Sequence, residues 1–251
     1  MSSSILWNLR PSETGRQIVM FPFLGGFGAS FNRLVKHLNG DWDIWTVNPP
    51  GHGTSDQPPY ERLAPLVDCY VDGFGDVLKP DAVFFGHSMG GVMAYHVMLE
   101  MARRSTFEGR RPTDLVLSAS SAPRDLPVVG YSTLPETDLL AHLSTFGAIS
   151  EDVARNKALI DMFLPAFRAD YRVLEDAKRT PPVKLDVRTR LILGGKDGQT
   201  PAGTAAAWQD YIARPIRTHL LEQEGHMFVL HAIEPLDTII NDLNKIPAEH
   251  V

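Results

Sequence analysis

The sequence has a single cysteine, Cys69, among its 251 residues. One cysteine cannot form an intramolecular disulfide, so a reducing compartment suits the chain. There is also no run of roughly 18 apolar residues, the length that a transmembrane helix needs. The N-terminal stretch MSSSILWNLRPSETG has no basic segment followed by a long apolar one, which argues against a secretory signal. We therefore expect a soluble, cytoplasmic protein.

Basic residues are also in short supply, with 24 Lys and Arg against 30 Asp and Glu and a net charge of -6. Apart from short clusters at 103–104 and 110–111, they are scattered. This distribution argues against nucleic acid or an anionic membrane as the main partner. No H-E-x-x-H motif and no cysteine pair occur, so we expect no metal site.

Hydrophobic residues make up 43% of the chain, enough for a substantial core, and short apolar runs alternate with helical patterns. Several runs are apolar at consecutive positions, which is typical of parallel strands buried on both faces. The predicted strands are 18–21, 42–47, 82–85, 115–118, 191–193 and 217–221, and the predicted helices are 30–38, 63–77, 91–104, 204–212 and 236–243. The alternation predicts a single α/β domain over residues 1–251 with a doubly wound, mostly parallel sheet.

One segment breaks this alternation. From about residue 134 to 180 the pattern is helical with no strand, and Pro181-Pro182 close it. Because the segment falls between two predicted strands, it is an insertion on the sheet. It either adds ordinary helical packing or forms a lid over a site at the strand ends. Its position favours a lid over residues 134–182.

The stretch Gly86-His87-Ser88-Met89-Gly90 matches the pattern G-x-S-x-G between a predicted strand and a predicted helix. Such a turn holds its serine in a strained conformation at the carboxyl edge of the sheet, and the amides of the following helix point at the same spot. An incidental serine in a glycine-rich turn is the alternative. The strand-turn-helix context favours a nucleophile, and with it an α/β-hydrolase fold.

A serine hydroxyl needs a base, and in this fold the chain order is serine, acid, histidine. His226, in the stretch EGHMF, follows the last predicted strand in a loop where the base belongs. His231 is the competitor, but it fits better in the following helix. Asp197 ends the strand-and-turn stretch LILGGKD in the correct order. It is either the acid that orients His226 or a turn aspartate that binds its own backbone; the other two residues favour the acid.

The oxyanion formed during acyl transfer needs two amide donors. We expect one from Met89, the residue after the serine. The second should come from the loop FPFLGG, where glycines let the backbone approach a substrate; Leu24 is the first choice and Phe23 the second. A phosphate-binding loop is the alternative, but the stretch lacks the P-loop lysine and the dinucleotide-binding spacing. Acyl transfer to water needs no cofactor, and we expect none.

Four stretches together resemble the type II thioesterases that accompany nonribosomal peptide and polyketide synthases. They are FPFLGGFGASF, FFGHSMGG, LPAFRADYRVLE, and LILGGKDGQTP with EGHMFVL, and the resemblance runs from about residue 17 to 235. The third is the most discriminating, because generic esterases share the others in looser form. One stretch departs from the family: Pro50-Gly51-His52-Gly53 stands where the family often has Pro-Gly-Arg.

The resemblance implies a monomeric enzyme that hydrolyses acyl thioesters on the phosphopantetheine arm of an acyl or peptidyl carrier protein, with Ser88, Asp197 and His226 as its triad. A general carboxylesterase or lactonase acting on free esters is the alternative. A non-catalytic scaffold would predict a broken triad. If the insertion admits the pantetheine arm, apolar side chains should line the acyl channel, and the candidates are Phe23, Met162, Phe163, Leu164 and Phe167. Each of these could instead be ordinary core at helical spacing.

Overall fold

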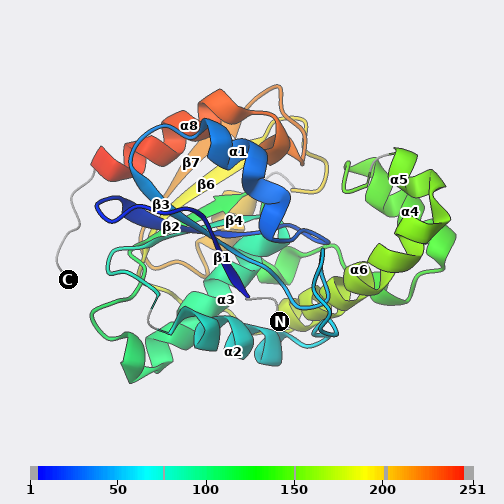
Figure 1. The fold of residues 1–251 in the computed structure, drawn as a ribbon, viewed down its shortest axis with the longest axis horizontal. Helices are drawn as coiled ribbons and strands as arrows, with labels where there is room; N and C mark the ends of the chain where they lie inside the picture. The colour runs from blue at the N-terminus through cyan, green and yellow to red at the C-terminus, as the bar shows by residue number, and fades with distance from the viewer. Residues whose placement is uncertain (1–4, 76, 150, 201–202, 246–251) are drawn as a thin grey trace.

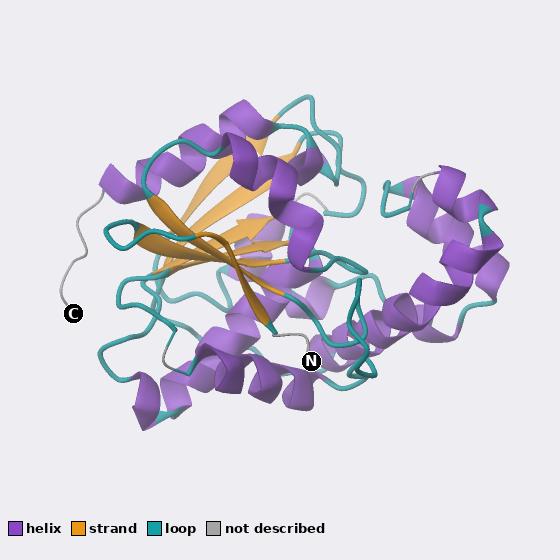
Figure 2. Ribbon diagram, viewed as in Figure 1, coloured by secondary structure: helices purple, strands orange, loops and turns teal. Residues whose placement is uncertain are grey.

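The computed structural model describes residues 5–75, 77–149, 151–200 and 203–245, and its centre is a seven-stranded sheet (Figures 1 and 2). The sheet has the order β1-β3-β2-β4-β5-β6-β7. The strands are β1 (Leu6–Arg10), β2 (Arg16–Phe21), β3 (Trp42–Val47), β4 (Val83–His87), β5 (Asp114–Ser118), β6 (Arg188–Gly194) and β7 (Ile216–Leu221). All neighbouring strands pair in parallel except β1, which runs antiparallel to β3. The predicted mostly parallel, doubly wound sheet is confirmed.

Strand β1 is the one strand that the sequence pattern did not predict. Its stretch LWNLR has a single fully buried residue, Leu6, and the pairing with β3 shifts register between Asn8 and Arg10. An edge strand that is half exposed and irregular carries neither the continuous apolar run of a central strand nor a clean alternation. The core strands are visible in the sequence because they are buried on both faces, and β1 is not.

Helices cover both faces of the sheet (Figure 1). On one face lie α1 (Asn32–His37) and α8 (Ile233–Asn241), and on the other lie α2 (Leu63–Phe74) and α3 (Met89–Arg103). The short α7 (Thr204–Trp208) precedes β7, and the 3-10 turns are η1 (Gly28–Phe31), η2 (Ser105–Phe107), η3 (Pro123–Asp125), η4 (Tyr131–Thr133), η5 (Phe228–Leu230) and η6 (Asp242–Lys245). Each face of the sheet buries its own apolar cluster, so the fold has three layers: helices, sheet, helices.

The chain between β5 and β6 is helical and forms an insertion on the sheet. It contains α4 (Glu136–Thr145), α5 (Glu151–Arg155) and α6 (Lys157–Lys178), with α4 and α5 standing out beyond the sheet and α6 running back to the body (Figure 1). The long helix α6 buries one face, which includes Ile160, Phe167, Tyr171, Leu174 and Ala177. These positions are three, four or seven residues apart, so they share one face of the helix and an amphipathic pattern anchors the insertion. Within the described part of the chain, no helix has the length and apolar character to cross a bilayer.

Candidate active site

Ser88 lies between the end of β4 and the start of α3 and has φ 54° and ψ -119°. A non-glycine residue in this region stores roughly 1–3 kcal/mol of backbone strain. The two glycines of the motif explain why the turn can be so tight. A Cβ on Gly86 would lie 2.2 Å from the carbonyl oxygen of Gly90, and one on Gly90 would lie 2.0 Å from that of Phe21. Only glycine fits at either position, and the serine side chain is lifted to the sheet edge.

Three side chains from separate loops form one hydrogen-bonded chain, which we call the triad: Ser88, His226 and Asp197. The distance is 2.8 Å from Ser88 Oγ to His226 Nε2 and 2.9 Å from His226 Nδ1 to Asp197 Oδ2. Because the carboxylate only accepts, Nδ1 carries its proton and donates, which leaves Nε2 to accept from the serine hydroxyl. His231, the competitor, lies away from Ser88 and pairs with Glu224 at 2.6 Å on the surface.

The Asp197 side chain is fully buried, and its two oxygens have different partners. Oδ1 accepts from the amides of Gln199 at 2.8 Å and Thr200 at 3.3 Å, whereas Oδ2 accepts from His226 and from Thr200 Oγ1 at 2.6 Å. Burial raises the pKa of Asp197, but the hydrogen bonds and the charge of His226 outweigh it, and the pKa is lowered. Asp197 is therefore both the turn aspartate that binds its own backbone and the partner of the histidine.

Two backbone amides beside Ser88 have no acceptor within the described residues: those of Met89 and Leu24. Met89 begins α3, so its amide carries the positive end of the helix dipole. Both residues line the cavity that contains Ser88 and His226. Such an arrangement can bind an oxyanion. Phe23, in contrast, faces away from this cavity, and its ring packs edge-on against Phe31 and His87 at 6.5 and 5.9 Å between centroids.

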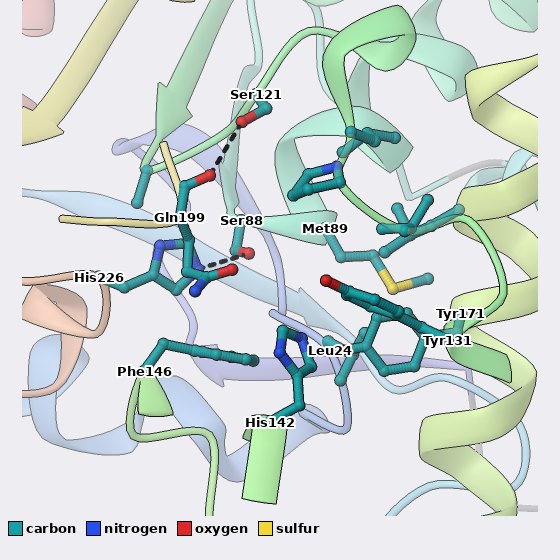
Figure 3. A pocket seen from close by; sticks show the side chains of 15 residues that line it. Leu24, Ser88, Met89, Ser121, Tyr131, His142, Phe146, Tyr171, Gln199 and His226 are labelled. Atoms are coloured by element: carbon teal, nitrogen blue, oxygen red, sulfur yellow. Dashed lines mark hydrogen bonds between the residues drawn. The ribbon is translucent and has the colours of Figure 1, made fainter. Parts of the chain in front are cut away.

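The cavity over Ser88 is small, about 60 Å³. Figure 3 shows side chains that face Ser88 and His226 from the opposite side. We call four of them the aromatic wall: Tyr131 from η4, His142 from α4, Phe146 after α4, and Tyr171 from α6. The remaining lining residues are Leu24, Ser88, Met89, Ala119, Ser121, Leu126, Pro127, Val128, Leu174, Gln199 and His226.

The aromatic wall is held together by ring contacts. The His142 ring lies 4.4 Å from Tyr131 and 5.3 Å from Phe146 between centroids, and the Phe146 ring stands edge-on to His226 at 5.4 Å. Burial lowers the pKa of His142, so this imidazole is neutral at physiological pH. The wall therefore presents an uncharged, mostly apolar surface directly against the histidine of the triad.

The apolar residues that the sequence suggested for the acyl channel do not line the cavity, and this prediction is corrected. Met162 is 54% exposed. Phe163 and Leu164 are half-buried at the edge of the core, and Phe167 packs on the backbone of Gly25. Met162 precedes Tyr171 by nine residues, and at about 100° per residue this puts the two on opposite sides of α6.

Sequence reasoning missed the residues that do line the cavity from the insertion. For Tyr171 and Leu174 a signal existed, because they lie one and two turns after Phe167 on the buried face of α6. For His142 there was none, since a histidine in a polar helix is typical of a surface position. His87 is buried beside Ser88, with Nδ1 2.9 Å from Ser118 Oγ. Burial and the neighbouring His226 keep its pKa well below the ordinary value, so it stays neutral.

No group of three or more His, Cys, Asp or Glu in the described residues could hold a metal ion. Comparison with known proteins agrees with the fold. The thioesterase-domain family model matches residues 16–246, so the chain belongs to the thioesterase family.

Individual relatives sharpen this assignment. The probable cadicidin biosynthesis thioesterase of Streptomyces griseus is 24% identical over 89% of this chain, and the match spans 61% of that protein's length. Among solved structures, the RedJ thioesterase from the prodiginine pathway of Streptomyces coelicolor is 26% identical, with a TM-score of 0.84 and 93% of each chain covered. The type II thioesterase BorB from the borrelidin cluster is 24% identical, with a TM-score of 0.84 and 97% and 98% covered. The α/β-hydrolase fold and the resemblance to type II thioesterases are confirmed.

Proposed function

We propose that this chain is a serine thioesterase that hydrolyses acyl groups from the phosphopantetheine arm of acyl or peptidyl carrier proteins. Its role is the removal of stalled or mis-primed groups in nonribosomal peptide or polyketide synthesis. One observation carries the proposal: the hydrogen-bonded triad beside two unpartnered amides, in a chain of the thioesterase family.

The first half-reaction transfers the acyl group to Ser88. Its Oγ attacks the thioester carbonyl while His226 Nε2 takes the hydroxyl proton, and the ionised Asp197 stabilises the resulting imidazolium through Nδ1–H. The oxygen of the tetrahedral intermediate takes up negative charge and accepts hydrogen bonds from the amides of Met89 and Leu24. Collapse breaks the carbon–sulfur bond, and the leaving sulfur takes from His226 the proton that came from Ser88.

The second half-reaction releases the acid. Water replaces the thiol beside His226 Nε2, which removes a proton as the water oxygen attacks the acyl-enzyme carbonyl. The same two amides stabilise the second oxyanion. Collapse then returns the proton to Ser88 Oγ and frees the carboxylic acid.

The insertion over residues 134–182 acts as a lid in this proposal. The support is that His142, Phe146 and Tyr171 cover the cavity from the side opposite Ser88 (Figure 3). The cavity over Ser88 is about 60 Å³, which is narrow for an acyl group with its pantetheine arm. In this proposal the insertion shifts when the pantetheine arm enters, and when it closes it limits the access of water.

A hydrolysis assay tests the substrate. One acyl group is presented on a holo carrier protein, on free pantetheine and as an activated oxygen ester, with Ser88→Ala as the blank. We expect kcat/KM to be highest on the carrier protein, because its surface is then recognised as well as the acyl group. If the oxygen ester is turned over as well or better, the enzyme is a general carboxylesterase or lactonase.

A further inference from the structure

A buried ion pair lies outside the triad and joins the insertion to the body of the domain. Asp170 of α6 and His52, in the loop after β3, lie 3.0 Å apart between Oδ2 and Nε2. Their side chains are only 6% and 3% exposed. The reaction steps above use neither residue, and a buried charge is costly unless its partners repay the loss of hydration.

The contacts of His52 define its charge. Nδ1 lies 3.0 Å from the carbonyl oxygen of Pro50, and Nε2 faces the Asp170 carboxylate. Both partners can only accept hydrogen bonds, so both ring nitrogens must carry a proton. Burial lowers the pKa of His52, but the charge and hydrogen bond of Asp170, with the Pro50 carbonyl, outweigh it and the pKa is raised. The imidazolium gives Asp170 a fixed, charged partner.

The same carboxylate oxygen of Asp170 also accepts a hydrogen bond from the amide of Gly25, at 2.7 Å. Gly25 has φ 73° and directly follows Leu24, whose own amide is one of the two unpartnered donors beside Ser88. One turn earlier on α6, Phe167 packs so closely that a Cβ on Gly25 would lie 2.2 Å from its ring. Helix α6 therefore holds the Leu24–Gly25 peptide in two ways: the Asp170 carboxylate accepts from its amide, and the Phe167 ring packs against it.

The loop's own hydrogen bond leaves part of this order to α6. A turn from the Gly26 amide to the Phe23 carbonyl, at 2.7 Å, spans Leu24 and Gly25. Within such a turn the Leu24–Gly25 peptide has two orientations, and glycine permits the one with positive φ. Asp170 accepts from the Gly25 amide in the observed orientation and so favours it, which fixes the backbone directly after the Leu24 amide.

We propose that Asp170, held by protonated His52, is a positioning residue that sets the oxyanion-binding amide of Leu24. The oxyanion site is then complete only while α6 is seated on the loop. This inference rests on the proposed function, because it takes the Leu24 amide as an oxyanion donor. It adds that the insertion does more than cover the cavity: it supplies the contact that orders half of the oxyanion site.

The test separates binding of the tetrahedral state from binding of the ground state. Acetyl-pantetheine is the substrate, butylboronic acid is the probe that forms a tetrahedral adduct on Ser88, and the thioether analogue of acetyl-pantetheine is the ground-state probe. For Asp170→Ala we expect kcat to fall by about 10- to 100-fold, because one oxyanion donor is worth about 10²–10³ in kcat. Boronate affinity should fall by a similar factor, whereas KM and thioether affinity change less than about twofold.

Conservative variants should restore part of the loss. The amide oxygen of Asp170→Asn can still accept from Gly25, so its kcat should lie between those of the wild type and Asp170→Ala. His52→Gln should also have an intermediate kcat. It removes the positive charge that holds Asp170, but it leaves the Asp170 carboxylate to accept from the Gly25 amide. These two variants also carry the test if Asp170→Ala does not fold.

Asp176 provides a matched control on the same helix. Its carboxylate also accepts from a backbone amide, that of Leu63 at 3.3 Å, and pairs with a cation, Arg62 at 2.6 Å, but it contacts α2 rather than the oxyanion loop. Asp176→Ala should lower the melting temperature and leave boronate affinity unchanged.

Equal losses of boronate and thioether affinity in Asp170→Ala, or a boronate loss in Asp176→Ala, would overturn the inference. If Ser88→Ala is inactive while Asp170→Ala has normal kcat, this inference fails and the proposed function stands. If Ser88→Ala retains activity, the proposed function fails first.

Discussion

The two sides of the cavity are built from different kinds of structure. The triad comes from loops at the carboxyl ends of β4, β6 and β7, and each of its residues is held by backbone geometry or several hydrogen bonds. The aromatic wall comes from η4 and the insertion, and ring contacts hold it together. Hydrogen-bonded loops on a sheet edge permit one arrangement, whereas packed rings on helices can shift and repack. In the proposed function, bond chemistry falls to the hydrogen-bonded side of the cavity and substrate access to the side built from packed rings.

The largest effect should come from breaking the triad. Ser88→Ala and His226→Ala should each lower kcat by about 10⁴- to 10⁶-fold, because the members of such a triad act as a unit. His231→Ala is the matched control, since His231 pairs with Glu224 on the surface, and its kcat should stay within about twofold of the wild type. Steady-state hydrolysis of a carrier-bound or pantetheine thioester measures all three. A large loss in His231→Ala would mean that the base has been wrongly assigned.

The next effect should come from the backbone that holds Ser88. Gly90→Ala places a Cβ 2.0 Å from the Phe21 carbonyl oxygen, so we expect a loss of more than about 3 kcal/mol in the free energy of unfolding. Gly198→Ala has no atom within 4 Å of the added Cβ and should change stability by less than about 0.5 kcal/mol. Urea unfolding of both variants measures this. Equal stability of the two would show that the tight turn can relax.

Variants of the cavity-lining residues of α6 should change selectivity more than rate. Leu174→Ala or Tyr171→Ala enlarges the cavity from the α6 side, so kcat/KM for a longer acyl chain should rise about tenfold relative to a short one. Met162→Ala, on the exposed side of the same helix, should leave the ratio unchanged. A chain-length series on pantetheine thioesters measures the ratio. The prediction fails if Met162→Ala shifts the preference as much as Leu174→Ala and Tyr171→Ala do.

The smallest effect concerns the ion pair that joins the two sides. The folded pKa of His52 is raised, so its contribution to stability is fully present below the unfolded pKa and is lost as pH rises through the folded pKa. Asp170 of α6 is the charged group that faces His52. Tyr70 of α2 does not titrate in this window, because burial and the Asp170 charge raise its pKa well above 10.0.

We therefore expect the wild type to lose stability relative to His52→Gln as pH rises from below 6.5, the ordinary histidine value. Melting temperatures of the wild type and His52→Gln, measured at pH values from below 6.5 upward, show this difference in stability. Parallel curves would mean that folding does not raise the pKa of His52.

Sequence predicted the central strands and the triad because both depend on local pattern. Strands such as β4 and β5 are apolar on consecutive positions, and the glycines around Ser88 form a motif within one strand-turn-helix stretch. Strand β1 escaped prediction, since half-exposed edge residues carry a weak pattern. In α6 the helix was predicted and its cavity-facing side was not, because amphipathic spacing shows which residues share a face but not what that face meets.

The sequence by itself determined the class of the protein and indicated the candidate nucleophile and its order with the acid and the base, because a tight turn between strand and helix admits few residues. Only the tertiary structure decided which rings of the insertion meet the cavity. It also decided that Asp170 of α6 holds the amide of Gly25 while paired with His52. These residues come from three distant segments of the chain. No local pattern encodes their meeting, because the packing of α6 against the edge of the sheet brings them together.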